Sequence, residues 1–191
     1  MNNIILIGMM GSGKTSVGEA ISKKASIPFI DTDLMVEAKL EMTIPHIFEQ
    51  YGESYFRSHE AVVAQIAAAF PKAVIATGGG MVTNRLSMAL LSESGFVVYL
   101  CATPEQLHKR TAGDTNRPLR NRLEELLAER EHLYIGYSDY ILDIGESTVD
   151  ELSEMILNAY CNYKRPEPEH VGQTGARDLR YIDFGRDKRS D

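Results

Sequence analysis

The sequence predicts a three-layer α/β fold, in which a central five-stranded parallel sheet carries helices on both faces. Short apolar runs alternate along the chain with longer stretches of helical character, which is typical of this class. Most of the runs are apolar at consecutive positions, as expected for strands covered on both faces. With 191 residues, 43% of them hydrophobic, the chain can form one domain with a sizeable core.

The predicted elements follow one another from the first residues onward. The runs predicted as strands are 3–7, 28–31, 73–76, 96–100 and 140–142. The stretches predicted as helices are 15–25, 34–39, 44–51, 58–70, 85–92, 104–112, 123–133 and 149–160. In sheets of this kind ligands bind at the carboxyl ends of the strands, so functional residues are expected directly after each strand.

The first strand runs into a glycine-rich motif. Residues 8–15 read GMMGSGKT, which fits G-x-x-x-x-G-K-[ST], the phosphate-binding loop (P-loop). Its glycines allow backbone N–H groups to turn toward an anion, and the next helix directs its positive end there. Lys14 can reach the β- and γ-phosphates, and the Thr15 hydroxyl can bind Mg²⁺. A chance glycine-rich turn is the alternative, but the motif also has the right strand-to-helix context. The motif predicts a nucleoside triphosphate site without identifying the phosphoryl acceptor.

Two further motifs follow the second and third strands. Asp31 and Asp33 flank Thr32, and such a pair can hold Mg²⁺ and accept the proton of an acceptor hydroxyl. The alternative is a helix N-cap with an acidic first turn. Residues 77–80 read TGGG, and three glycines leave room for a ligand against the backbone, although a merely flexible turn is also consistent with them.

Several arginines are candidates for anion binding. Arg57 could pair with a substrate carboxylate, and Arg130 could do so from a later helix, although each taken singly would also suit the surface. Arg110 precedes a polar, basic stretch, 113–122, which contains Arg117. This stretch suits either a lid that closes over a nucleotide or an ordinary exposed loop.

Composition and charge limit the possible partners and location. The net charge of −7 does not suggest a nucleic-acid surface, and no apolar run is long enough to cross a membrane. Cys101 and Cys161 suit two thiols in a reducing cytoplasm, and we expect a cytoplasmic monomer. The predicted domain covers 1–163. Residues 164–191 hold seven basic and six acidic residues without clear periodicity, so we predict a polar C-terminal tail.

Taken together, these residues resemble the shikimate kinase family, in the family's order and spacing. The matching stretches are GMMGSGKT at 8–15, DTD at 31–33, Ile47 and Phe48 with Gly52, Glu53, Phe56 and Arg57, ATGGG at 76–80, RPL at 117–119, and Arg130 with Leu133 and Tyr134. The P-loop is generic, and the other elements together are much more specific. The sequence departs from the family at Arg120, at Ile135 and Gly136, and in a short loop after Asp143, where adenine contacts would fall.

The resemblance implies a P-loop kinase fold and ATP-dependent phosphorylation of the shikimate 3-hydroxyl, in aromatic amino-acid biosynthesis, with Mg²⁺ accompanying ATP. It implies an acceptor-binding region at about 32–60 and a lid at about 111–123. The implied catalytic residues are Asp33, which would hold or deprotonate the hydroxyl, and Lys14 and Arg117, which would stabilise the transferring phosphoryl group. The implied nucleotide-binding residues are Gly11, Ser12, Gly13, Lys14, Thr15, Ser16, Arg110 (near the adenine) and Arg117. The implied substrate-binding residues are Asp33, Gly78, Gly79 and Gly80, with Arg57 and Arg130 on the carboxylate, and the implied Mg²⁺ residues are Thr15 and Asp31.

Two other functions fit parts of the pattern. A related small-molecule kinase for another polyol acid, such as gluconate, would share the P-loop but would not need both Arg57 and Arg130. A nucleotide-binding regulatory protein without catalysis should have lost Lys14, Asp33 or Arg117, and all three are present.

Overall fold

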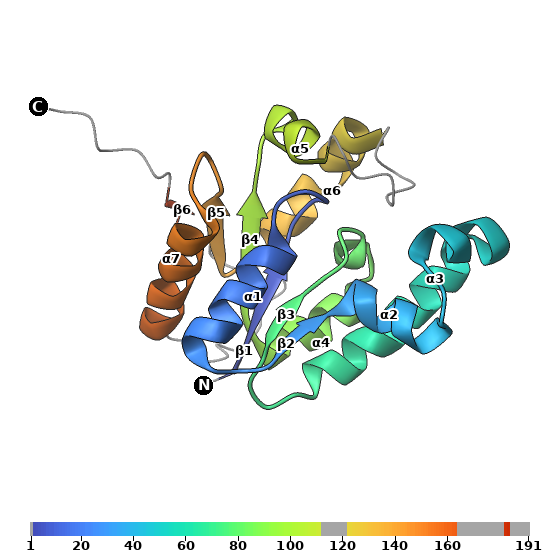
Figure 1. The fold of residues 1–191 in the computed structure, drawn as a ribbon, viewed down its shortest axis with the longest axis horizontal. Helices are drawn as coiled ribbons and strands as arrows, with labels where there is room; N and C mark the ends of the chain where they lie inside the picture. Colours follow the sequence, from blue (N-terminus) through green and yellow to red (C-terminus); the bar gives the residue numbers. More distant parts are fainter. Residues whose placement is uncertain (1, 112–121, 164–181, 184–191) are drawn as a thin grey trace, which may run out of the picture.

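The computed structural model describes residues 2–111, 122–163 and 182–183, and Figure 1 shows the arrangement. The strands are β1 (Asn3–Ile7), β2 (Phe29–Asp31), β3 (Val74–Ala76), β4 (Gly95–Cys101), β5 (Tyr140–Asp143) and β6 (Ile182–Asp183). The helices are α1 (Lys14–Ala25), α2 (Thr32–Leu40), α3 (Ile44–Ala68), the 3-10 turn η1 (Met81–Thr83), α4 (Arg85–Ser94), α5 (Pro104–Thr111), α6 (Leu123–Tyr137) and α7 (Val149–Asn162). Every predicted strand and helix lies within one of these elements or overlaps it.

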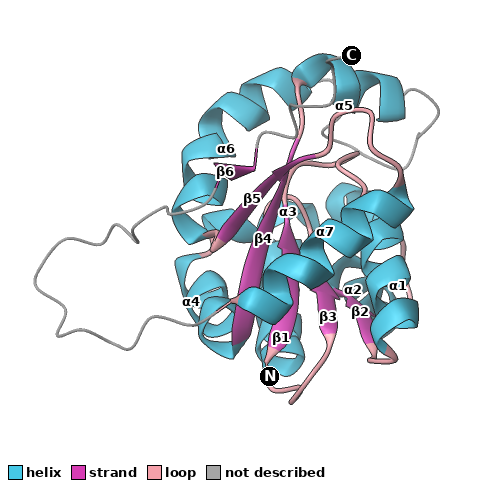
Figure 2. Cartoon of the chain, turned by 90° about the vertical axis from the view of Figure 1, so that its left-hand side faces the viewer, coloured by secondary structure: helices cyan, strands magenta, loops and turns pink. Residues whose placement is uncertain are grey.

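The sheet has the strand order β2-β3-β1-β4-β5-β6, and all the pairings in it are parallel. The predicted five-stranded parallel sheet is therefore confirmed, with one added edge strand. The central strand β1 is apolar except for Asn3 and fully buried along its length, because β3 and β4 flank it and helices cover both faces. Helices α1 and α7 pack together on one face, and α3, α4 and α6 lie on the other (Figures 1 and 2).

A small second core lies beside the main one. Helices α2 and α3 pack on each other around Val36, Ile47, Phe56 and Val63. These helices extend from the end of β2, over the range predicted as the acceptor-binding region.

The predicted break between two helices is confirmed at Gly52, which has φ 79° and ψ 170° and divides α3 into two helical parts. The predicted start of the second part is wrong, because the helix resumes at Glu53 and residues 53–57 are helical. Glycine tolerates the positive φ that this kink requires. Arg57 therefore lies on a helix, one turn from Glu53 and one turn from Glu60.

The C-terminal segment adds to the sheet. The two residues of β6 pair in parallel with β5, as Ile141 with Ile182 and Leu142 with Asp183 (Figure 2). The sequence analysis predicted a polar C-terminal tail and did not predict this pairing. Residues 112–121, which contain Arg117 and most of the predicted lid, lie outside the described residues. None of the helices described here is long and apolar enough to cross a bilayer.

The short β6 pairing predicts a small effect of removing the C-terminal segment. Deleting 164–191 should lower Tm by less than about 4 °C, or about 1 kcal/mol, because the described part of this segment joins β5 through two residue pairs. Thermal unfolding measures the change, and a deletion of 184–191, which keeps β6, is the control. A loss of ten degrees in the longer deletion alone would show that this segment is part of the core.

Candidate active site

The P-loop begins where β1 ends, at a position that only glycine fits. Gly8 has φ 145°, and a Cβ there would lie 2.7 Å from the carbonyl oxygen of Leu100 on β4. The Lys14 side chain, 8% exposed, donates hydrogen bonds of 2.8 Å to the carbonyls of Gly8 and Met9. The lysine ammonium is thus held against the loop's own backbone.

The N-terminus of α1 is open to an anion. Its N-cap, Gly13, has φ 87° and no side-chain capping bond, so no cap side chain occupies the first N–H groups of the helix. Thr15 and Ser16 in this first turn are exposed. Arg110 from α5 reaches the same place, because its Nη1 lies 3.6 Å from where a Cβ on Gly13 would be. The structure therefore brings Arg110 to the P-loop.

Asp31 connects β2 to the P-loop helix. Its Oδ2 accepts a 2.9 Å hydrogen bond from the Thr15 hydroxyl, and its Oδ1 accepts from the backbone N–H groups of Asp33 and Leu34. Asp31 is therefore the N-cap of α2, and the capping alternative holds for this aspartate while Asp33 lies in the first turn. The adjacent hydroxyl and carboxylate suit Mg²⁺, which typically takes one or two protein oxygens together with phosphate and water. In the described part of the chain, no group of three or more His, Cys, Asp or Glu residues could hold a metal.

The Asp33 carboxylate makes different contacts from that of Asp31. A Cβ on Gly78 would overlap with Asp33 Oδ1 and would lie 2.8 Å from Glu60 Oε1. The glycine loop therefore packs closely under both carboxylates. The Gly78 N–H also donates a 3.0 Å hydrogen bond to the hydroxyl of Thr32, which fixes the loop to the end of β2.

Arg57 lies between two carboxylates of its own helix. Its Nη1 donates to Glu60 Oε2 at 2.7 Å and its Nη2 to Glu53 Oε1 at 2.8 Å. Glu60 is only 1% exposed, and burial raises the pKa of its carboxyl group although the Arg57 cation opposes the shift. Its Oε1 has no hydrogen-bond partner among the residues that the structure describes. The Arg57 guanidinium also occupies the space that a Cβ on Gly80 would need.

Arg130 approaches the glycine loop from α6. It is 7% exposed, and its Nη1 makes a long hydrogen bond of 3.5 Å to the Gly79 carbonyl. Within the described residues Arg130 forms no ion pair. Its positive charge opposes the upward shift in the pKa of the Glu60 carboxyl group. One turn later on α6, the Tyr134 hydroxyl donates a 2.6 Å hydrogen bond to the same carbonyl. A buried guanidinium without a carboxylate partner is costly, so it favours an anionic ligand.

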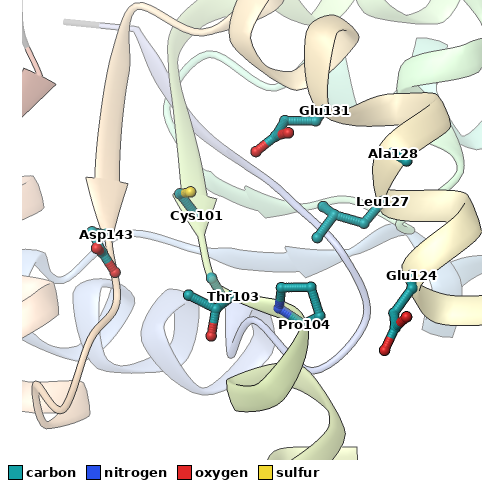
Figure 3. Close-up of a pocket in the computed structure, with 9 residues that line it drawn as sticks. Cys101, Thr103, Pro104, Glu124, Leu127, Ala128, Glu131 and Asp143 are labelled. Atoms are coloured by element: carbon teal, nitrogen blue, oxygen red, sulfur yellow. The ribbon is translucent and has the colours of Figure 1, made fainter.

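A cavity of about 350 Å³ lies at the carboxyl ends of β4 and β5 (Figure 3). Three carboxylates line it: Asp143 from β5, and Glu124 and Glu131 from α6. Their charge disfavours phosphate groups there. Cys101 also lines the cavity, and burial raises the pKa of its thiol, so it is not an activated nucleophile.

Two residues close to the predicted site were missed by the sequence analysis. Glu60 lies three residues after Arg57, but residues 52–57 were predicted as a loop, so the helical spacing was not used. Tyr134 was noted only as part of the family's motif. The predicted site residues that the structure describes gather at the carboxyl edge of β1, β2 and β3, with Arg110 and Arg130 approaching from α5 and α6.

Comparison with known proteins finds shikimate kinases by family model, by sequence and by structure. The family model described as shikimate kinase matches residues 10–161. A shikimate kinase of Thermoanaerobacter pseudethanolicus is 39% identical over 171 residues, covering 86% of this chain and 99% of that protein. A solved structure of the Acinetobacter baumannii shikimate kinase in complex with shikimate has a TM-score of 0.83 and 35% identity, covering 87% of this chain and 96% of that one.

A gluconokinase structure from Sinorhizobium meliloti also matches, with a TM-score of 0.55 and 20% identity over 84% of this chain and 91% of that one. At that identity it shows a shared fold only. The fold and the P-loop define an α/β P-loop kinase. The chain belongs to the shikimate kinase family.

The close contact between Gly80 and Arg57 predicts a loss of stability in Gly80→Ala. The added Cβ would displace a guanidinium that is held by a buried carboxylate, at a cost of about 1–3 kcal/mol. Tm should fall by about 2–4 °C per kcal/mol. The control is Gly136→Ala on α6, where nothing lies within 4 Å and helix propensity should raise stability slightly. An unchanged Tm in Gly80→Ala would contradict the packing described here.

Proposed function

We propose that this protein transfers the γ-phosphoryl group of ATP to the 3-hydroxyl of shikimate. The observation that carries the proposal is Arg130, a buried cation beside the glycine loop that has no carboxylate partner among the described residues. Shikimate carries a ring carboxylate distant from its reacting hydroxyl, and such a ligand would supply the missing charge. Membership of the shikimate kinase family supports the same choice of acceptor.

The nucleotide binds at the P-loop. The open N-terminus of α1 receives the phosphates, and Lys14 and Arg110 supply positive charge beside them. Arg117, outside the described residues, is proposed from the family resemblance to stabilise the transferring group. Thr15 and Asp31 would hold Mg²⁺, which neutralises charge on the phosphates when bound.

The acceptor binds against the glycine loop formed by Gly78, Gly79 and Gly80. Asp33 holds the 3-hydroxyl, because its carboxylate packs on Gly78 while Asp31 is engaged with Thr15 and the cap of α2. Arg130 binds the carboxylate. Arg57 contributes to the same positive region, although Glu53 and Glu60 already neutralise much of its charge.

In the reaction, the 3-hydroxyl oxygen attacks the γ-phosphorus, the bond to the β-phosphate oxygen breaks and ADP leaves. Asp33 accepts the hydroxyl proton. Lys14 stabilises the charge on the phosphoryl oxygens, which is the largest contribution a protein makes to phosphoryl transfer. The predicted cytoplasmic location and monomeric state remain predictions.

The proposal is tested by an acceptor screen. We expect Mg²⁺-ATP and shikimate to release ADP at least about a hundredfold faster than ATP with gluconate, because a site that fixes its acceptor by paired polar groups discriminates strongly. A coupled assay of ADP measures the rates, with Lys14→Ala as the inactive control. Preferential turnover of gluconate would replace this proposal by the alternative kinase, and nucleotide binding without any turnover would favour the regulatory protein.

The carboxylate clamp predicts a loss specific to acidic acceptors. Arg130→Ala should lower kcat/KM for shikimate about 30- to 1,000-fold, equivalent to about 2–4 kcal/mol, because a shielded arginine–carboxylate pair is strong. The loss should shrink for an analogue without the carboxylate, and ATP binding should stay nearly constant. Arg57→Ala should show the same selectivity and also a lower Tm, since Glu60 would lose its partner.

The exposed Arg85→Ala is the charge-matched control. Equal losses for shikimate and for its carboxylate-free analogue in Arg130→Ala would make the arginine structural.

A further inference from the structure

Tyr134 is a buried residue whose hydroxyl reaches the centre of the site. Its side chain is 0% exposed on α6, and its hydroxyl donates the 2.6 Å hydrogen bond to the Gly79 carbonyl. The Arg130 contact to this carbonyl is 3.5 Å, so Tyr134 makes the shorter of the two bonds. Gly79 is the middle residue of the glycine loop, and the tyrosine is therefore its principal anchor to α6.

The same hydroxyl also touches the P-loop. It lies 3.3 Å from the sulfur of Met9, whose carbonyl accepts a hydrogen bond from Lys14. A hydroxyl has one hydrogen and a thioether is a weak acceptor, so the hydrogen goes to the Gly79 carbonyl. Tyr134 thus stands where the acceptor loop and the P-loop meet.

The ring of Tyr134 is held in place by its neighbour in the core. It stacks on Tyr99 of β4, with ring centroids 5.0 Å apart. Burial raises the pKa of Tyr134, so its hydroxyl stays protonated near neutral pH and remains a donor. A buried hydroxyl with one short, well-placed acceptor restricts that acceptor's direction.

We propose that Tyr134 is a positioning residue of the acceptor site, acting through the Gly79 carbonyl. The peptide group between Gly79 and Gly80 is planar and trans, so fixing its carbonyl toward Tyr134 turns the Gly80 N–H in the opposite direction. Glycines on both sides of this peptide would otherwise let it rotate readily. Tyr134 therefore keeps the loop in one conformation for the acceptor. The inference rests on the proposed function, in which this loop holds shikimate.

The test is Tyr134→Phe, which removes the hydroxyl and keeps the ring. The matched control is Tyr99→Phe, which removes a buried hydroxyl from the stacked ring; that hydroxyl bonds with Cys101 and has no bond to the glycine loop. We expect KM for shikimate to rise about tenfold in Tyr134→Phe, as for one lost hydrogen bond of about 1.4 kcal/mol, with kcat changed less than threefold and KM for ATP less than twofold. In Tyr99→Phe all three constants should stay within twofold, even if Tm falls equally in both variants.

Two outcomes would overturn the assignment. If both variants changed KM for shikimate equally, the effect would come from the stability of the core. If the loss in Tyr134→Phe disappeared with the carboxylate-free analogue, Tyr134 would act through Arg130 and not through the glycine loop. The wild-type rate with shikimate tests the proposed function separately, and if another acceptor were preferred the same comparison would be made with it.

Discussion

The structure depends on one close contact, where the backbone at Gly8 meets the Leu100 carbonyl at the end of β4. No side chain fits between them, and the chain turns there with a φ that disfavours other residues. This contact places the P-loop directly on the buried sheet. Helix α1 then starts at Lys14 with an uncapped N-terminus directed at the phosphate site. A flexible loop would lose this preorganisation.

The acceptor side of the site depends on glycines that leave space for neighbouring side chains. The positions that Cβ atoms would take on Gly78 and Gly80 are filled by Asp33, Glu60 and Arg57. The buried Glu60 needs the Arg57 cation, and Arg57 is thereby held in one rotamer against the loop. Because Glu53 and Glu60 offset much of the charge of Arg57, the positive charge beside the glycine loop and the P-loop comes mainly from Arg130, Lys14 and Arg110, in a chain whose net charge is −7.

The C-terminal segment lies beyond the part of the chain that the family model matches. The family model ends at residue 161, and the Thermoanaerobacter relative is covered almost completely while part of this chain remains unmatched. Strand β6 lies in that added segment and pairs with β5. It occupies backbone groups on a strand that would otherwise form the edge of the sheet, and exposed edges favour association with other chains.

The sequence by itself determined the order of strands and helices, the parallel sheet and the P-loop, because consecutive apolar runs and the GMMGSGKT motif are local signals. It also placed Asp31, Asp33 and the glycine loop at strand ends. Only the tertiary structure showed that the two aspartates have different contacts and that Arg130 is buried. It also showed that Arg57 pairs with Glu60 and that Tyr134 reaches the Gly79 carbonyl. The burial and pairing of a side chain depend on which residues distant in sequence pack against it. Strand β6 forms because β5 offers an unpaired edge of the sheet, which the two residues of β6 do not themselves reveal.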